Sequence, residues 1–240
     1  MPVGDVLAVV AVALGATAQR LTGLGFALVA APFLVVLLGP RTGVTLANVL
    51  SIVLCLIVLA STFRHLHRRL AAALVGGAAL AVPVGALVVR TLPTPALLIG
   101  VGTLTAGSVL WVVTGRALPL LRRRGGAVLA GVASGFCNTT AATGGPPLAV
   151  YAASTGWPHR AFVPSVQLVG LVSNTLSVVV KGTPAVSWPL VAACGLAMAA
   201  GLTGGQFLVH RVSDAHARRA MLLLALGGSL LAVVKGVTSL

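Results

Sequence analysis

Several stretches of the chain run without a charged residue for about the length of a membrane-spanning helix, among them Thr45–Thr62 and Val186–Val209. A transmembrane helix needs about 20 apolar residues, and these runs are continuous rather than alternating, which argues against an outer-membrane barrel. Only 8% of the 240 residues are charged, against about 25% in soluble domains. The sequence therefore predicts an all-α polytopic membrane protein.

The positive charge is gathered in short segments between the apolar runs. The formal net charge is +14, and clusters that flank membrane spans normally mark the cytoplasmic side, where anionic lipid attracts them. The clusters are Arg64–Arg69, Arg116, Arg122–Arg124 and Arg211–Arg219. The charge predicts the lipid bilayer as a partner and gives no reason to expect nucleic acid.

The glycine-rich stretch Gly131–Tyr151 interrupts the apolar pattern. A regular helix cannot run through Pro146-Pro147, because each proline lacks the donor and clashes with the preceding turn. Proline is favourable in the first turn of a new helix, so we expect one segment to end near Asn138–Gly145 and another to begin at Pro146. Such breaks are tolerated where the backbone faces protein or a watery cavity, and in transporters they commonly form the substrate site. A lipid-facing kink or an external loop is the alternative.

The apolar runs follow the same order in each half of the chain. A long run, Val6–Leu38, is interrupted at Gln19–Gly25 and precedes three plain runs. A second interrupted run, Ala127–Thr155, again precedes three. The six plain runs are Gly43–Thr62, Leu70–Val89, Ala96–Thr114, Val163–Val180, Val186–Val209 and Ala220–Val234. This order indicates two repeats of one layout.

Short residue matches support the duplication. Gly107–Gly115 aligns with Gly228–Gly236 at a separation of 121 positions, and Pro32 aligns with Pro147 at 115. The expected divisions are a first transmembrane repeat at 1–115, a basic cytoplasmic linker at 116–126 and a second transmembrane repeat at 127–240.

The basic clusters also indicate how the repeats are oriented. Arg64–Arg69, Arg122–Arg124 and Arg218–Arg219 share the cytoplasmic side only if each interrupted run is a hairpin of half-helices that returns to its starting side. Each repeat then has an odd number of pieces, so the second repeat is inverted relative to the first. Inverted repeats with a substrate site near the midplane are common in secondary transporters.

The two interrupted runs resemble those of a known family. Gly15–Pro32 and Gly131–Tyr151 are similar to the TauE/SafE sulfite exporter family, also called the TSUP permeases, and the resemblance extends over nearly the whole chain. It implies transport of small sulfur-containing anions such as sulfite, sulfonates or sulfoacetate across the bacterial inner membrane, without selecting among them. Gly144–Pro147 is close to the family pattern, whereas Ala30–Pro32 stands where a glycine-rich run is expected.

An anion needs hydrogen-bond donors, which the breaks supply. Backbone N–H groups at the start of a helix bind anions with help from the helix dipole, and glycine allows close approach of the backbone. The predicted substrate-binding residues of the second break are Asn138, Thr139, Thr140, Thr143, Gly144, Gly145 and Pro146. Those of the first break are Gln19, Arg20, Thr22, Gly23 and Gly25. Asn48 and Gln167, which are 119 positions apart on the helices that follow, complete the set.

Some of these residues have alternative interpretations. Arg20 would cost about 2.5–3.5 kcal/mol at the centre of the bilayer, which would imply a function, but at a hairpin tip it could extend to the interface instead. Asn48 and Gln167 either face a cavity or join helices through hydrogen bonds.

The residues that are missing bear on function as well. The chain has no Glu, and its two Asp residues, Asp5 and Asp214, lie near segment ends. No acid–base pair, nucleophile–base pair or metal-ligand cluster is present, so we expect neither an enzyme nor a cofactor or metal. The sequence predicts a secondary transporter of a small anion, multi-pass in the bacterial plasma (inner) membrane. An anion channel, or a non-transporting subunit whose polar breaks serve assembly, is the alternative, and a homo-oligomer is left open.

Overall fold

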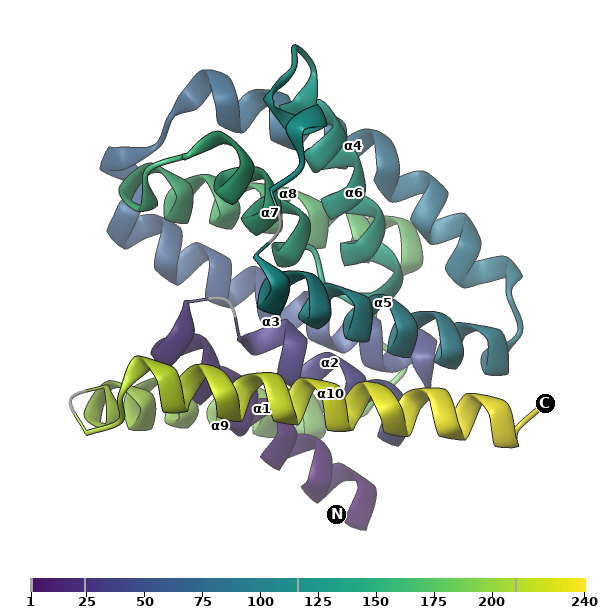
Figure 1. The fold of residues 1–240 in the computed structure, drawn as a ribbon. Coiled ribbons are helices and arrows are strands. Elements are labelled where there is room, and N and C mark those ends of the chain that lie inside the picture. Colours follow the sequence, from purple (N-terminus) through teal and green to yellow (C-terminus); the bar gives the residue numbers. More distant parts are fainter. Residues whose placement is uncertain (1, 24, 116, 210) are drawn as a thin grey trace.

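The computed structural model describes residues 2–23, 25–115, 117–209 and 211–240, with the backbone alone for His159. Within these ranges the chain forms ten α-helices, two short 3-10 helices and no strand (Figure 1). The α-helices are α1 (Val3–Thr22), α2 (Phe26–Leu38), α3 (Pro40–Thr62), α4 (Arg68–Thr91), α5 (Thr94–Thr114), α6 (Gly126–Ala141), α7 (Gly145–Thr155), α8 (His159–Lys181), α9 (Trp188–Leu208) and α10 (Asp214–Thr238). The 3-10 helices are η1 (Phe63–His65) and η2 (Pro119–Arg122).

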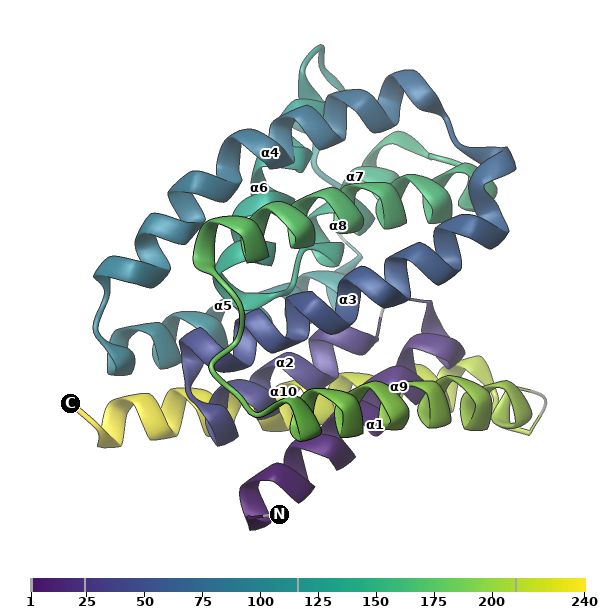
Figure 2. The same ribbon diagram turned by 180° about the vertical axis from the view of Figure 1, so that it is seen from behind.

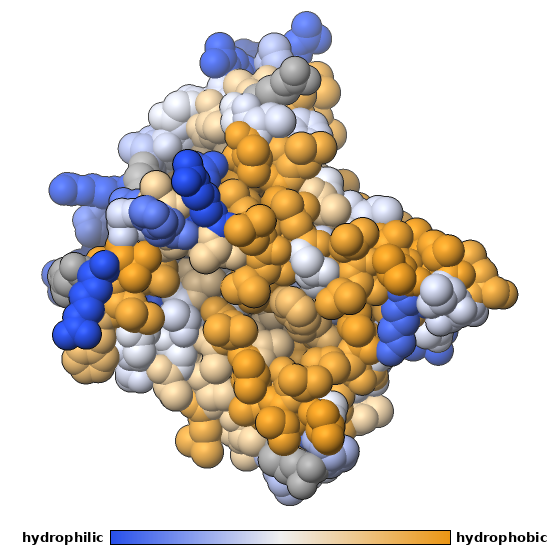
Figure 3. Space-filling model, turned by 60° about the horizontal axis from the view of Figure 1, so that its bottom comes forward, coloured by the Kyte–Doolittle hydropathy of each residue, from blue (hydrophilic) through white to orange (hydrophobic). Residues whose placement is uncertain are grey.

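Seven helices within the described residues, α1, α3, α4, α5, α8, α9 and α10, are long and apolar enough to cross a membrane. Their outer faces expose large apolar side chains, for example Leu80 at 72% and Leu196 at 74%. Figure 3 shows apolar residues over most of one face, with hydrophilic residues mainly along its margins. The prediction of an all-α, multi-pass membrane protein is confirmed.

Both predicted helix breaks are present. α1 ends at Thr22, and Gly23 follows in the left-handed conformation at φ +82°. α6 ends at Ala141, and Ala142 follows at φ +58°, which is uncommon for a residue with a Cβ. The second break is thus held in a sparsely populated backbone conformation before α7 begins.

The two breaks differ from the prediction in detail. Pro146 and Pro147 lie in the first turn of α7, as expected, but Pro32 lies inside α2. The alignment of Pro32 with Pro147 was therefore wrong, because the two prolines occupy different positions in their helices. α1, with 20 residues, is also longer than a half-helix and could cross a membrane alone.

The helix boundaries reveal a different spacing between the halves. The ends of α1 and α6, at Thr22 and Ala141, are 119 positions apart. The same separation relates the N-cap residues of α2 and α7, Gly25 and Gly144, as well as both ends of α3 and α8. Residues 119 positions apart in these helices are called counterparts below.

Helices of one half pack on helices of the other. α1 packs along α9, α6 along α4, α3 against α8 and α5 against α10 (Figures 1 and 2). Glycine makes the closest approaches possible: a Cβ on Gly201 would lie 2.4 Å from the Ala13 oxygen, and one on Gly77 would lie 2.3 Å from the Val128 oxygen. Small residues at such contacts are typical of membrane helix packing.

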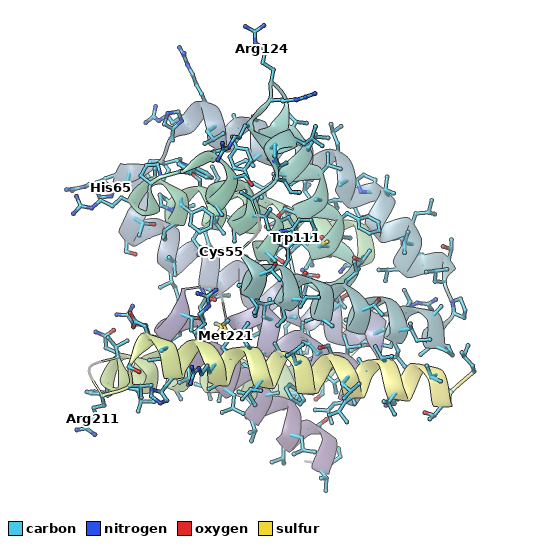
Figure 4. All side chains as sticks on the ribbon, in the orientation of Figure 1. Cys55, His65, Trp111, Arg124, Arg211 and Met221 are labelled. Atoms are coloured by element: carbon cyan, nitrogen blue, oxygen red, sulfur yellow. The ribbon has the colours of Figure 1, made fainter. Side chains whose placement is uncertain are left out.

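Loops gather at two ends of the molecule. At one end Arg218 donates to the Val112 oxygen at 3.0 Å, and Figure 4 shows His65, Arg124 and Arg211 projecting outward around this end. At the other end Arg41 donates to the Val89 oxygen at 3.1 Å. The first, called the arginine-rich end, carries Arg64, Arg68, Arg69, Arg122, Arg123, Arg124, Arg160, Arg211, Arg218 and Arg219. The second, called the opposite end, carries Arg41, Arg90, Lys181 and Lys235.

Candidate functional site

A cavity with polar and apolar side chains in its wall lies between the two helix breaks. Its volume is about 80 Å³, whereas a water molecule needs roughly 10–15 Å³ by a comparable measure, so a small ion with several heavy atoms has room. Both breaks contribute to its wall, together with α3 and α8. The lining includes Gln19, Phe26, Ala27, Ser51, Leu54, Cys55, Ser134, Asn138, Ala142, Gly144, Gly145, Leu148, Val166, Gln167, Gly170, Ser173 and Asn174.

The Gln19 side chain holds the first break together. Its Oε1 accepts from the N–H of Phe26 at 3.0 Å, and its Nε2 donates to the Gly23 oxygen at 2.8 Å. One amide therefore satisfies a donor at the start of α2 and an acceptor just beyond α1. Gly25 packs tightly here, because a Cβ would lie 2.7 Å from the Ala18 carbonyl carbon.

The second break is held from within α6. Ser134 Oγ donates to the Gly144 oxygen at 2.7 Å, and the N–H of Thr143 donates to the Cys137 oxygen at 3.3 Å. The next helical residues, Pro146 and Pro147, have no N–H. The donors left at the start of α7 are those of Gly144 and Gly145, and both residues line the cavity.

Two buried hydroxyl groups near the second break have no hydrogen-bond partner among the described residues, Thr143 Oγ1 and Ser173 Oγ. Ser173 lines the cavity and is 1% exposed. Buried polar groups normally find a partner, so this hydroxyl is available to a ligand. Ser173 was not among the predicted binding residues.

A second space of about 780 Å³, called the vestibule, lies beside the cavity and extends past the end of α1. The two spaces share Gln19 and Gln167 in their walls. Arg20 is exposed in the vestibule, where its guanidinium donates to Gln206 Oε1. Arg20 therefore lies on the approach to the cavity rather than in it.

The side of the cavity that faces the opposite end is closed by hydrogen bonds. Asn174 Oδ1 accepts from Asn48 Nδ2 at 2.6 Å and from Asn138 Nδ2 at 2.9 Å. All three side chains are at most 5% exposed. Behind this asparagine layer, Lys181 Nζ donates to Asn48 Oδ1 at 2.8 Å. Neither Asn174 nor Lys181 was predicted. The signal for Asn174 was its spacing, because Gln167, Gly170 and Asn174 share one face of α8.

The fold brings part of the predicted set together. Those that line the cavity are Gln19, Asn138, Gly144, Gly145 and Gln167. Those in the vestibule are Arg20, Thr22 and Gly23, with Gln19 and Gln167 shared.

The other predicted residues lie outside these two spaces. Thr139 and Thr140 donate to backbone oxygens of the preceding turn, at 2.9 and 2.8 Å. Asn48 belongs to the asparagine layer. Pro146 lines two other pockets, a mainly apolar one and one that it shares with Thr22, Asp214 and Arg218. The remaining two are Gly25, which is a close-packing residue, and Thr143, which is buried at the break.

A polar cavity between two interrupted helices, in a multi-pass membrane protein, is the arrangement of secondary transporters. Residues 7–231 match the family model described as sulfite exporter TauE/SafE. The chain belongs to this family, whose members are membrane transporters rather than enzymes. No match was found among curated proteins or among solved structures.

Proposed function

We propose that this protein is a secondary transporter that moves a small sulfur-containing anion, sulfite or an organosulfonate, across the bacterial inner membrane. The observation that carries the proposal is that α2 and α7 both begin at the cavity wall, with Phe26 and Gly145. The positive ends of two helix dipoles therefore converge on one small space, which is a ready-made anion site.

The lining of the cavity favours an anion over a cation. It contains amide, hydroxyl and backbone groups and no carboxylate. Amide and hydroxyl groups can donate hydrogen bonds to oxyanion oxygens. Gln167, Ser173 and the Gly145 N–H are the donors that we assign to the substrate.

The open and closed sides favour a carrier over a channel. A channel needs a continuous path, whereas here the vestibule adjoins one side of the cavity and the hydrogen-bonded asparagine layer lies on the other side. Alternating access, in which one repeat moves against the other around a fixed site, explains how an anion would pass.

We further propose that 1–115 and 127–240 are inverted repeats joined by the basic linker 116–126, and that the arginine-rich end is cytoplasmic. The crossed packing of α1 on α9 and α4 on α6 supports the duplication, and the ten arginines at one end support the orientation. Cysteines placed one at a time at Arg218 and Arg219 should resist an impermeant maleimide in intact cells. Strong labelling from outside would reject this orientation.

Uptake into proteoliposomes tests the function directly. Purified protein should take up radiolabelled sulfite, and competition by methanesulfonate, sulfoacetate and acetate defines which head group it recognises. A saturable rate far below ion-channel conductance is expected of a carrier. Protein that is folded but neither binds nor moves any of these anions would contradict the proposal and favour a structural subunit.

A further inference from the structure

Lys181, at the end of α8, differs from the other basic residues of the chain. Every Arg side chain that the structure describes is exposed, as is Lys235, whereas Lys181 is half-buried. Its ammonium group points inward, because Nζ donates to Asn48 Oδ1 at 2.8 Å and to the Thr139 oxygen at 3.0 Å. The fold therefore turns one cation toward the interior of the helix bundle.

This cation has no carboxylate to pair with. The sequence contains only two acidic residues, Asp5 and Asp214, and they lie in the first turns of α1 and α10. The partners of the Lys181 ammonium are neutral oxygens. Removing a charge from water is costly unless an opposite charge or strong hydrogen bonds compensate, so an anion is the partner that this site lacks.

The ammonium lies one layer of side chains away from the cavity. Asn48 bonds to Lys181 through Oδ1 and to Asn174 through Nδ2, at 2.8 and 2.6 Å. Asn174 in turn lines the cavity. A rotation of the Asn48 amide would break both bonds together and would leave the ammonium with the Thr139 oxygen as its remaining acceptor.

We propose that Lys181 is a substrate-binding residue, which receives the anion when the asparagine layer opens toward the opposite end. Lys181 then exchanges Asn48 Oδ1 and the Thr139 oxygen for oxygen atoms of the anion. This inference rests on the proposed transport function and adds a second cationic position to it. Arg20 attracts the anion in the vestibule, and Lys181 neutralises it beyond the cavity.

A purely structural role for Lys181 makes different predictions. Thr139 lies in the last turn of α6, where carbonyl groups are unsatisfied, and a cation at a helix C-terminus stabilises the helix. In that case the loss of Lys181 would lower thermal stability and leave the affinity for the anion unchanged. Anion affinity and stability must therefore be measured on the same purified protein.

The test compares Lys181→Gln and Lys181→Arg with Lys235→Gln. Lys235 is a matched control, because it lies at the same end, is exposed, and donates to the Val36 oxygen at 2.6 Å. Sulfite is the probe, with binding followed by thermal shift in detergent and uptake followed in proteoliposomes. We expect Lys181→Gln to weaken sulfite binding by about tenfold or more, since a hydrogen bond to a charged group is worth roughly 1.5–3 kcal/mol. Lys181→Arg should retain part of the binding, and Lys235→Gln should match wild type.

Unchanged sulfite affinity and uptake in folded Lys181→Gln protein would overturn the inference while transport by wild type stands. Failure of wild type to bind or move sulfite and the competing anions would instead overturn the transport function, and this inference with it. If Lys181→Gln does not fold, Asn48→Ala decides. It keeps the ammonium but removes its amide acceptor, so sulfite should raise the melting temperature more than in wild type. An equal or smaller rise would count against Lys181.

Discussion

The two sides of the cavity are built from counterpart residues, yet their chemistry differs. In each pair, one member lines the vestibule or the cavity. The other belongs to the hydrogen-bonded group formed by the asparagine layer and Lys181. The pairs are Gln19 with Asn138, Gln167 with Asn48, Cys55 with Asn174, and Thr62 with Lys181. On the closed side the four members are joined by hydrogen bonds. On the open side no hydrogen bond that the structure describes joins their counterparts to one another.

The pair of Cys55 and Asn174 shows why the sides differ. An amide oxygen accepts two strong hydrogen bonds, as Asn174 Oδ1 does, whereas a thiol is a weak donor and acceptor. The vestibule side therefore cannot form the same bridge. In the transport cycle that we propose, this difference favours a resting state that is open at the arginine-rich end, and the following predictions test it.

The largest effect is expected at the cavity that both sides share. Gly145→Val places a branched side chain on the wall at the start of α7, so it should abolish sulfite uptake. Gly227→Val is the control, because a Cβ at Gly227 meets nothing within 4 Å. Size-exclusion profiles must show that both variants fold. Normal sulfite binding and uptake by folded Gly145→Val protein would remove the second break from the site.

Asn174→Ala is expected to produce a large change in which end of the cavity is open. The change removes the common acceptor of Asn48 and Asn138, and an unsatisfied buried donor costs about 1–3 kcal/mol. The equilibrium between the state open at the arginine-rich end and the state open at the opposite end should therefore shift roughly ten- to hundredfold toward the second. A cysteine at Ser177, which is 0% exposed behind the layer, reports this opening through its maleimide labelling rate.

The control for the Asn174→Ala experiment is the same protein with Asn174 retained. The native cysteines must be replaced, including Cys55, the counterpart of Asn174. In this background Ser177→Cys should be labelled slowly as long as Asn174 is present. Equal labelling with and without Asn174→Ala would show that the asparagine layer is not the barrier.

A smaller and more specific effect is expected from Ser173→Ala. The hydroxyl has no hydrogen-bond partner among the described residues, so the melting temperature of the variant should equal or exceed that of wild type. If the hydroxyl donates to the anion, sulfite affinity should fall roughly ten- to hundredfold, as expected for a hydrogen bond of about 1.5–3 kcal/mol. Thr143→Ala should behave alike if Thr143 turns toward the substrate. Ser165→Ala is a control, since Ser165 donates within its own helix at 2.8 Å.

Backbone chemistry made the helix breaks predictable from sequence. Glycine at Gly23 and proline at Pro146 restrict what the chain can do whatever surrounds it. Side-chain roles were less predictable, because they depend on the neighbouring helix. Thr139 looked like a free donor, but its hydroxyl bonds to its own helix and contacts Ser177 Oγ at 2.7 Å.

The residues that sequence reasoning missed have ordinary sequence contexts. A lysine at the end of an apolar run normally reaches the membrane interface, so nothing marked Lys181 as buried. Only the packing of α8 against α6 and α3 brings its ammonium within 3.0 Å of the Thr139 oxygen. Ser173 was missed for a related reason, since a helical serine usually bonds to its own backbone.

The smallest effect is expected at Arg20, on the open side. Its guanidinium is exposed and already bonded to Gln206, and exposed charge interactions are worth about 0–1 kcal/mol. Arg20→Gln should raise the apparent KM for sulfite by at most about fivefold, without changing kcat or membrane expression. Arg20→Lys should keep part of the attraction, because the charge remains while the planar fork is lost. The KM of Arg20→Gln should approach that of wild type at high salt, where exposed charges are screened. A fall in kcat, or a rise in KM that persists in high salt, would place Arg20 in the substrate site itself. The open side of the cavity would then contact the anion directly, as the closed side is proposed to do through Lys181.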